Sequence, residues 1–141
     1  MAYWLFKSEP GTWSWENQTK KGKEGEGWDG VRNYQANNNM KKMKIGDLGF
    51  FYHSVKEKQI VGIVRVIGEH RPDPTDKKGI FGMVVIEAVQ QLKKYVHLSE
   101  MKSNHKLADL ALIKQARLSV VPISKEHWKE ICIMAETKNK F

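Results

Sequence analysis

Cysteine is nearly absent from this chain, which has only Cys132 among its 141 residues and therefore forms no internal disulfide. A disulfide-stapled scaffold is excluded, and at this length a folded chain buries roughly 68–70% of its extended surface without one. No segment approaches the ~18 consecutive apolar residues of a membrane span. The amino terminus lacks the basic leader of a signal peptide. These absences predict a soluble intracellular protein, cytoplasmic or, in a eukaryote, nuclear.

Arginine is also scarce. Four arginines, Arg32, Arg65, Arg71 and Arg117, stand against 20 lysines, and the formal net charge is +8. A basic balance is compatible with polyanion binding, although a lysine-rich, solvated surface gives the same total. Where lysine is the usual cation, a retained arginine suggests that its planar guanidinium matters, as in bidentate contacts with phosphate.

Familiar catalytic patterns are missing. The 5 histidines and the one cysteine show neither the HxE nor the CxxC spacing of zinc deaminases. There is no GxSxG elbow, and the glycines at 25–27 lack the strand and the Gly-Lys-Ser/Thr ending of a phosphate-binding loop. The sequence predicts a binding protein without catalytic residues, metal or cofactor. The alternatives are a protein-interaction module and an unrecognised nucleobase- or RNA-modifying enzyme.

Apolar and aromatic stretches predict several short strands, at residues 3–7, 48–54, 60–68, 81–89 and 117–121. The last of these is expected to end at Pro122. Short helices are expected at 14–20, capped by Thr12 or Ser14, from the cap Asn33 to about Met43, at 98–101 and 106–112, and after the cap Ser124. Residues 20–27 are glycine and charge, which predicts a mobile loop.

The last helix carries a core-facing stripe, in which Trp128, Ile131, Cys132 and Ala135 follow helical spacing. Strands joined mainly by hairpins, with short helices between them, predict an α+β fold. We expect one domain over residues 1–141, with a curled sheet or small barrel surrounded by short helices. The last few residues are expected to form a loose tail.

Four blocks carry the most specific pattern. They read Tyr-Trp-Leu-Phe-Lys-Ser-Glu-Pro at 3–10, Trp-Asp-Gly-Val-Arg-Asn-Tyr-Gln-Ala at 28–36, Gly-Asp at 46–47 with Phe-Tyr-His-Ser at 51–54, and Arg-Leu-Ser-Val at 117–120 with Pro122 and Trp128 behind. Together they resemble the EVE family, a branch of the PUA-like superfamily related to YTH and ASCH domains. Two positions depart from that pattern: Asn37 replaces an arginine, which would remove a cation beside the site, and Tyr95 replaces a proline.

The resemblance implies a PUA-like mixed β-barrel without catalytic activity. Its pocket would hold one modified base of DNA or RNA, single-stranded or flipped, and the protein would be a monomer. By the same resemblance, four segments surround the pocket. They contribute Lys7, Ser8 and Glu9; Trp28, Val31, Arg32, Asn33, Tyr34 and Gln35; Tyr52, His53 and Ser54; and Arg117, Leu118 and Ser119.

A protein that reads an unpaired base needs an aromatic wall, polar groups for the base edge and cations for phosphates. Trp28 is the favoured wall, with a buried anchor as its alternative role. Trp13 and Trp15 are other candidate walls, whereas Trp4 is expected in the core. Tyr52 could serve as wall or as core.

Neutral donors and acceptors for a base edge are available from Ser8, Asn33, Gln35 and Ser54, although capping and turn contacts use the same groups. His53 is favoured as a structural histidine. Glu9 could accept a proton from an exocyclic amine or pair with Lys7 or Arg117. Arg32 and Arg117 could contact phosphate or base, or orient Glu9 or Asp29 instead.

Overall fold

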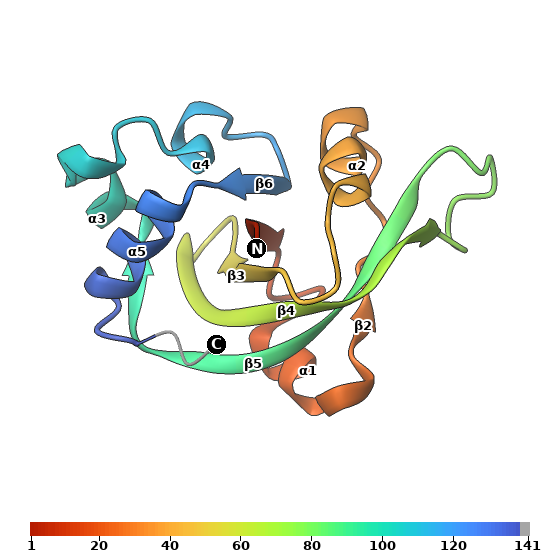
Figure 1. Ribbon diagram of the computed structural model, residues 1–141, viewed down its shortest axis with the longest axis horizontal. Coiled ribbons are helices and arrows are strands. Elements are labelled where there is room, and N and C mark those ends of the chain that lie inside the picture. Colours follow the sequence, from red (N-terminus) through yellow and green to blue (C-terminus); the bar gives the residue numbers. More distant parts are fainter. Residues whose placement is uncertain (139–141) are drawn as a thin grey trace.

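A curled sheet of six strands organises the computed structural model, which describes residues 1–138 (Figure 1). The strands are β1 (Tyr3–Ser8), β2 (Glu26–Gly27), β3 (Leu48–His53), β4 (Gln59–Pro72), β5 (Gly82–His97) and β6 (Val120–Ile123). The helices are α1 (Trp15–Lys20), α2 (Tyr34–Lys41), α3 (Leu98–Ser103), α4 (Ala111–Lys114) and α5 (Lys125–Met134), with short 3-10 turns η1 (Gly22–Glu24) and η2 (His105–Leu107). The expected carboxyl-terminal tail lies outside the described residues.

The strand order is β2-β5-β4-β3-β1-β6. β1 pairs in parallel with β3, and the other neighbours are antiparallel. Register shifts along the β4–β5 pair let these two long strands bend across the molecule. In the described part of the chain β2 and β6 do not pair with each other, so the sheet curls without closing into a barrel. The predicted α+β class and curled sheet are confirmed.

The end of β4, the start of β5 and the loop between them, residues 71–82, project from the body and are called the arm below (Figure 1). The sequence predicted both strands too short, because polar and charged residues interrupt their apolar pattern beyond 68 and 89. The extra length of β4 carries the arm to the loop that follows β2, whereas the extra length of β5 lies at its far end.

Two other predictions were wrong. The last strand is Val120–Ile123 and runs through Pro122, because β6 lies at the edge of the sheet, where a missing N–H costs no ladder bond. Residues 20–27 are not a mobile loop. They form the end of α1, η1 and β2, with Glu26 and Gly27 paired to Ile86 and Val85.

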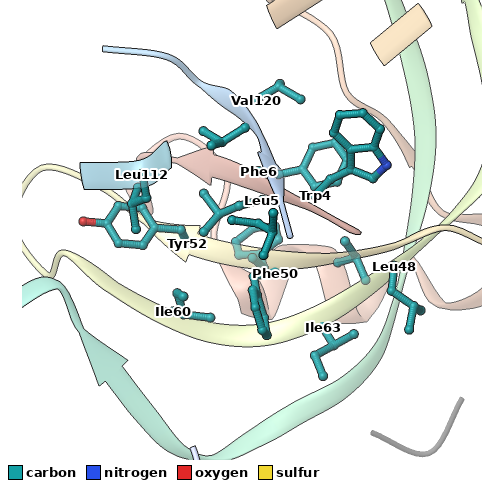
Figure 2. Close-up of a cluster of buried hydrophobic side chains, with 14 of the residues drawn as sticks. Trp4, Leu5, Phe6, Leu48, Phe50, Tyr52, Ile60, Ile63, Leu112 and Val120 are labelled. Carbon is teal, nitrogen blue, oxygen red and sulfur yellow. The ribbon is translucent and has the colours of Figure 1, made fainter. Parts of the chain in front are cut away.

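The core lies between the curled sheet and the helices, and Figure 2 shows part of it around Leu5, Phe6 and Phe50. Trp4 is buried there, as predicted, and its indole N–H donates to Asp47 at 3.0 Å. Trp15 is also a core residue. Its ring lies so close to Gly62 that an added Cβ would sit 2.4 Å from it, so β4 needs a glycine at this point.

The helix caps follow the sequence closely. Ser14, not Thr12, caps α1, and Asn33 caps α2 by accepting the Ala36 N–H at 2.9 Å. Ser124 caps α5, whose predicted stripe of Trp128, Ile131, Cys132 and Ala135 is buried. Burial raises the pKa of the Cys132 thiol to about 11, so Cys132 stays a neutral, apolar core residue. Within residues 1–138 no helix has the length and apolar character to cross a bilayer.

Candidate nucleic-acid site

A cavity of about 460 Å³ opens where β1 ends, between the loop after β1 and the loop after β2. Its volume is in the range of small-molecule sites. Most of its lining comes from those two loops, four residues come from β1 and β2, and one comes from the segment before β6. The lining residues are Lys7, Ser8, Glu9, Thr12, Trp13, Glu26, Gly27, Trp28, Asp29, Gly30, Val31, Arg32 and Ser119.

The loop after β1 forms one wall and is held by its own side chains. The Ser8 hydroxyl donates to the Trp13 carbonyl. The Glu9 carboxylate accepts the Gly11 N–H at 3.0 Å and the Thr12 hydroxyl at 3.3 Å. These bonds fix a tight turn that brings Thr12 and Trp13 over the cavity, while Glu9 remains exposed to solvent.

Two indole rings line the cavity. Trp28 is 8% exposed and packs edge-on against Phe6 and Phe51, with ring centroids 5.3 and 5.7 Å away. Trp13 is half-buried, and its Nε1–H donates to the Gln18 side-chain oxygen at 2.9 Å. Gln18 is itself fully buried and donates to the Ile86 carbonyl. Trp28 is thus both a core anchor and a lining residue, so the two roles proposed for it are not exclusive.

The loop of residues 29–32 is fixed by a carboxylate from the arm. Asp73 accepts the Gly30 N–H at 2.8 Å and an Arg32 guanidinium N–H at 3.1 Å. Its other oxygen accepts the Thr75 N–H and hydroxyl, both at 2.7 Å, and Arg32 also donates to Thr75 at 2.9 Å. Gly30 adopts φ +81°, a conformation that favours glycine and lets its N–H reach Asp73.

The Asp73 carboxylate has no solvent-accessible side-chain surface. Burial by itself raises the pKa of Asp73, but hydrogen bonds from Thr75, Gly30 and Arg32 outweigh burial and lower the pKa to about 2. Asp73 is therefore charged at neutral pH. Sequence reasoning expected Arg32 to pair with Glu9 or Asp29 if it paired at all, and neither is its partner.

Ser119, at the end of the segment of residues 115–119, completes the lining, and this segment is held mainly by hydrogen bonds near the solvent. The Lys7 ammonium donates to the Ala116 carbonyl at 2.8 Å, and the Lys7 N–H donates to the Ser119 carbonyl at 2.9 Å. Burial lowers the pKa of Lys7. Arg117 is exposed and makes no hydrogen bond or ion pair with any residue from 1 to 138.

The cavity is not uniformly basic. Lys7 and Arg32 are its cationic lining residues, and both are committed to protein oxygens. Glu9, Glu26 and Asp29 supply three carboxylates around the same space. Glu9 accepts from Gly11 and Thr12, Glu26 pairs with Lys21 at 3.6 Å, and the Asp29 side chain has no partner within residues 1–138. The site can therefore accept hydrogen bonds from a ligand more readily than it can hold a phosphate inside.

Of the residues predicted to surround the pocket, seven lie along this cavity: Lys7, Ser8, Glu9, Trp28, Val31, Arg32 and Ser119. Three others lie at the start of α2, outside the lining. Asn33 is the helix cap, Gln35 donates to the Gln115 side chain at 2.7 Å, and Tyr34 is exposed beside Phe81.

The remaining predicted residues are not among those that line the cavity. Tyr52 is buried in the core cluster of Figure 2, because β3 is an inner strand with both faces covered. His53 accepts the Trp15 N–H at 3.0 Å and contacts Glu57, as expected of a structural histidine. Leu118 is buried, and Ser54 and Arg117 are not lining residues.

The inference from Asn37 was also wrong. This side chain is buried beneath α2, where its oxygen accepts the Gly82 N–H at 3.0 Å and contacts His70 at 2.9 Å. It therefore does not lie beside the cavity, and its replacement of an arginine removes no cation from there.

Sequence reasoning missed two residues that position the site, Asp73 and Gln18. Asp73 did carry a signal, because an Asp side chain often accepts from the backbone two residues later, as Asp73 does from Thr75. Gln18 carried no signal that separates it from an ordinary exposed helix residue. Among residues 1–138 no group of three or more His, Cys, Asp or Glu side chains could hold a metal ion.

Comparison with known proteins places these features in a family. A family model described as EVE domain matches residues 2–134. Mouse thymocyte nuclear protein 1 is 33% identical, over 96% of this chain and 74% of its own length. A crystal structure from Agrobacterium tumefaciens is 48% identical with a TM-score of 0.94, covering 99% of this chain and 96% of that one.

Another similar structure contains bound DNA. Human thymocyte nuclear protein 1, in complex with DNA containing 5-methylcytosine, is 32% identical with a TM-score of 0.89, covering 99% of this chain and 100% of that one. A YTH domain from Zygosaccharomyces rouxii shares only the fold, with 15% identity and a TM-score of 0.59, covering 99% of this chain and 87% of that one.

Proposed function

We propose that this chain, which belongs to the EVE domain family, binds nucleic acid and takes one modified base into the cavity beside Trp28. The observation that carries the proposal is a cavity of about 460 Å³ lined by two indoles, Trp13 and Trp28, that are held in place by the protein. A base withdrawn from its neighbours loses its stacking partners, and aromatic side chains can replace them.

The polar lining favours a base that carries an exocyclic amine. Cytosine and adenine present an amino donor, whereas thymine and uracil present a carbonyl acceptor at the corresponding position. Carboxylates only accept hydrogen bonds, and Glu9, Glu26 and Asp29 surround the cavity. The complex of the human relative with 5-methylcytosine DNA supports this choice, because its modified base also carries such an amine.

An apolar part of the lining can accept the modification. Val31 is buried and lines the cavity in the same loop as Trp28. An added methylene in an apolar pocket is worth about 1–3 kcal/mol, so a methylated base should bind about tenfold or more tightly than its unmodified counterpart. Selectivity on this scale suits a binding protein that distinguishes modified sites.

The proposed role is binding without turnover. The lining contains serine, threonine and carboxylates but no histidine or cysteine, so no nucleophile there has an imidazole base beside it. The hydroxyl of Ser8 is already donated to the Trp13 carbonyl. We therefore assign the polar lining residues to holding the loops and recognising the base, and not to catalysis.

The test is a binding screen of short oligonucleotides that differ in one central base: 5-methylcytosine, 5-hydroxymethylcytosine, N6-methyladenine, thymine, and unmodified cytosine and adenine. We expect at least one modified, amine-bearing base to bind about tenfold more tightly than its unmodified form, in DNA or RNA. Mass spectrometry of the recovered oligonucleotide should show it unchanged. Equal affinity for all oligonucleotides would overturn base recognition, and a chemically altered product would indicate an enzyme.

A matched variant locates the binding. Trp13→Ala removes a half-buried lining ring and should abolish the preference for the modified base. Ile133→Ala removes an exposed side chain on α5, which does not line the cavity, and should change nothing. If both variants keep the preference, the base binds elsewhere on the protein.

A further inference from the structure

We propose that Tyr34, with Phe81 behind it, is a stacking surface for the nucleotide that flanks the base in the cavity. This inference rests on the proposed function and extends it from one base to its neighbour. Tyr34 is the first residue of α2 and is 66% exposed, which is high for an aromatic side chain.

The Tyr34 ring adjoins the cavity through a short series of contacts. Arg32 lines the cavity, and its guanidinium carbon lies 5.9 Å from the centroid of the Phe81 ring. The Phe81 ring in turn lies 5.0 Å from the Tyr34 ring, inclined at 46°. An aromatic surface therefore begins at the edge of the cavity and continues onto α2, where the next nucleotide of a bound strand would lie.

The position of Tyr34 is fixed without help from the hydrophobic core. Asn33 caps the helix, and Phe81 comes from the end of the arm, whose own backbone is held by Asp76: this carboxylate accepts the Ile80 and Phe81 N–H groups at 2.9 and 2.7 Å. Phe81 thus supports the Tyr34 ring from one side, and most of the Tyr34 side chain is still exposed. A preformed, exposed aromatic ring is what a stacking base requires.

The charge beside this surface suits a nucleotide. The arm carries Arg71, Lys77 and Lys78, all exposed. Its two acids are already engaged, because Asp73 binds Arg32 and Asp76 binds backbone N–H groups. Lys77 and Lys78 make no ion pair within residues 1–138, so their charges are available to a phosphate. An aromatic face with cations beside it matches a base and its phosphate.

The experiment compares three ligands: the 5-methyl-2′-deoxycytidine nucleoside, a five-nucleotide DNA with a central 5-methylcytosine, and the same DNA with abasic sites on both sides of that base. Tyr34→Ala should weaken binding of the full pentanucleotide about 5- to 150-fold, the range of one base–aromatic stack. It should leave the nucleoside and the abasic ligand unchanged, because neither has a flanking base. Tyr34→Phe should retain the affinity of the parent.

Ile133→Ala is again the control, since it removes another exposed apolar side chain, on α5. The surface is overturned if Tyr34→Ala binds the full pentanucleotide like the parent. It is also overturned if Tyr34→Ala weakens all three ligands equally, because Tyr34 would then act on the cavity itself. Failure of the proposed function looks different: the parent protein would not distinguish 5-methylcytosine or another modified base from its unmodified form in any ligand.

Discussion

The two sides of the cavity are held in opposite ways. On the side of residues 28–32, a buried carboxylate, Asp73, ties the loop to the arm through Gly30, Arg32 and Thr75. On the side of residues 115–119, Lys7 of β1 donates to the Ala116 and Ser119 carbonyls, and Arg117 is exposed to solvent. The side of residues 28–32 is therefore preorganised before a ligand binds. The side of residues 115–119 is adjustable, because it can change its conformation when a ligand binds.

The same contrast distinguishes Arg32 from Arg117, for which the sequence predicted the same possible roles. Arg32 directs its guanidinium toward the Val31 carbonyl, Asp73 and Thr75, so its first role is to position the cavity loop. Arg117 makes no hydrogen bond or ion pair within residues 1–138, so it does not position the cavity in this way. We therefore expect Arg32 to matter chiefly for stability and Arg117 chiefly for affinity.

The largest effect is expected for Trp28→Ala, on the preorganised side. Trp28 is buried against Phe6 and Phe51, so its removal should lower the free energy of unfolding by about 3–5 kcal/mol. Because the ring also lines the cavity, affinity for the modified base should fall as well. Thermal unfolding and oligonucleotide binding, measured on the same variant, test both effects.

Trp28→Phe separates the two roles. It should recover part of the stability and part of the stacking, because phenylalanine keeps an aromatic face of smaller area. If Trp28→Ala has the same melting temperature as the parent, the side of residues 28–32 is not anchored in the core.

The next effect concerns Asp73→Asn. The charged carboxylate accepts from Gly30, Arg32 and Thr75, and replacing it with a neutral amide should cost about 2 kcal/mol of stability. The pKa of Asp73 is lowered to about 2 in the folded protein, from an ordinary value of 3.8. Its stabilising contribution is therefore complete above pH about 4 and lost as the pH falls toward 2.

Denaturant unfolding of both proteins between pH 2 and 7 measures this contribution. The stability difference between parent and Asp73→Asn should shrink as the solution is acidified. Asp109→Asn is the matched control, since Asp109 is exposed and its side chain makes no hydrogen bond or ion pair within residues 1–138. A difference that stays constant with pH would remove Asp73 as the group that fixes the loop.

The features that the sequence predicted correctly depend on residues that are close together in the chain. The caps Asn33 and Ser124 and the buried stripe around Trp128 depend on neighbours within one or two helical turns, and each prediction was confirmed. The curled sheet followed from the pattern of apolar strands. Placement of single side chains on the inner strand β3 was not predictable, because all six of its residues are buried and no alternation marks a face.

The contacts that define the cavity loop span long distances in sequence. Asp73 lies 41 residues from Arg32, and the two meet only because β4 continues beyond its apolar segment into the arm. Asn37 meets Gly82 across 45 residues for the same reason. Periodicity reports burial along one element, so it contains no information on which loop an extended hairpin will reach.

A smaller effect is expected for Arg32→Lys. Lysine keeps a charge near Asp73 but cannot also reach Thr75 and the Val31 carbonyl, so stability should fall by about 1 kcal/mol. Affinity should fall only slightly, because the loop loosens while the ligand loses no direct contact. Urea unfolding and oligonucleotide titration check the two quantities. A variant as stable as the parent but with strongly weakened binding would mean that Arg32 contacts the ligand, and the contrast between the two sides would fail.

The smallest effect on the protein is expected for Arg117, on the adjustable side. Because Arg117 is exposed and unpaired within residues 1–138, Arg117→Ala should leave the melting temperature unchanged. If its guanidinium binds one phosphate, the slope of log affinity against log salt should decrease in magnitude by about 1, with a few-fold loss of affinity at moderate salt. Arg117→Lys should keep most of the salt slope, since a point charge remains, but should not recover full affinity if the contact is bidentate. Lys138→Arg, at an exposed position away from the cavity, is the control. An unchanged slope for Arg117→Ala would show that the strand does not pass over residues 115–119, and the path across Tyr34 and the arm would then be the one that carries the phosphates.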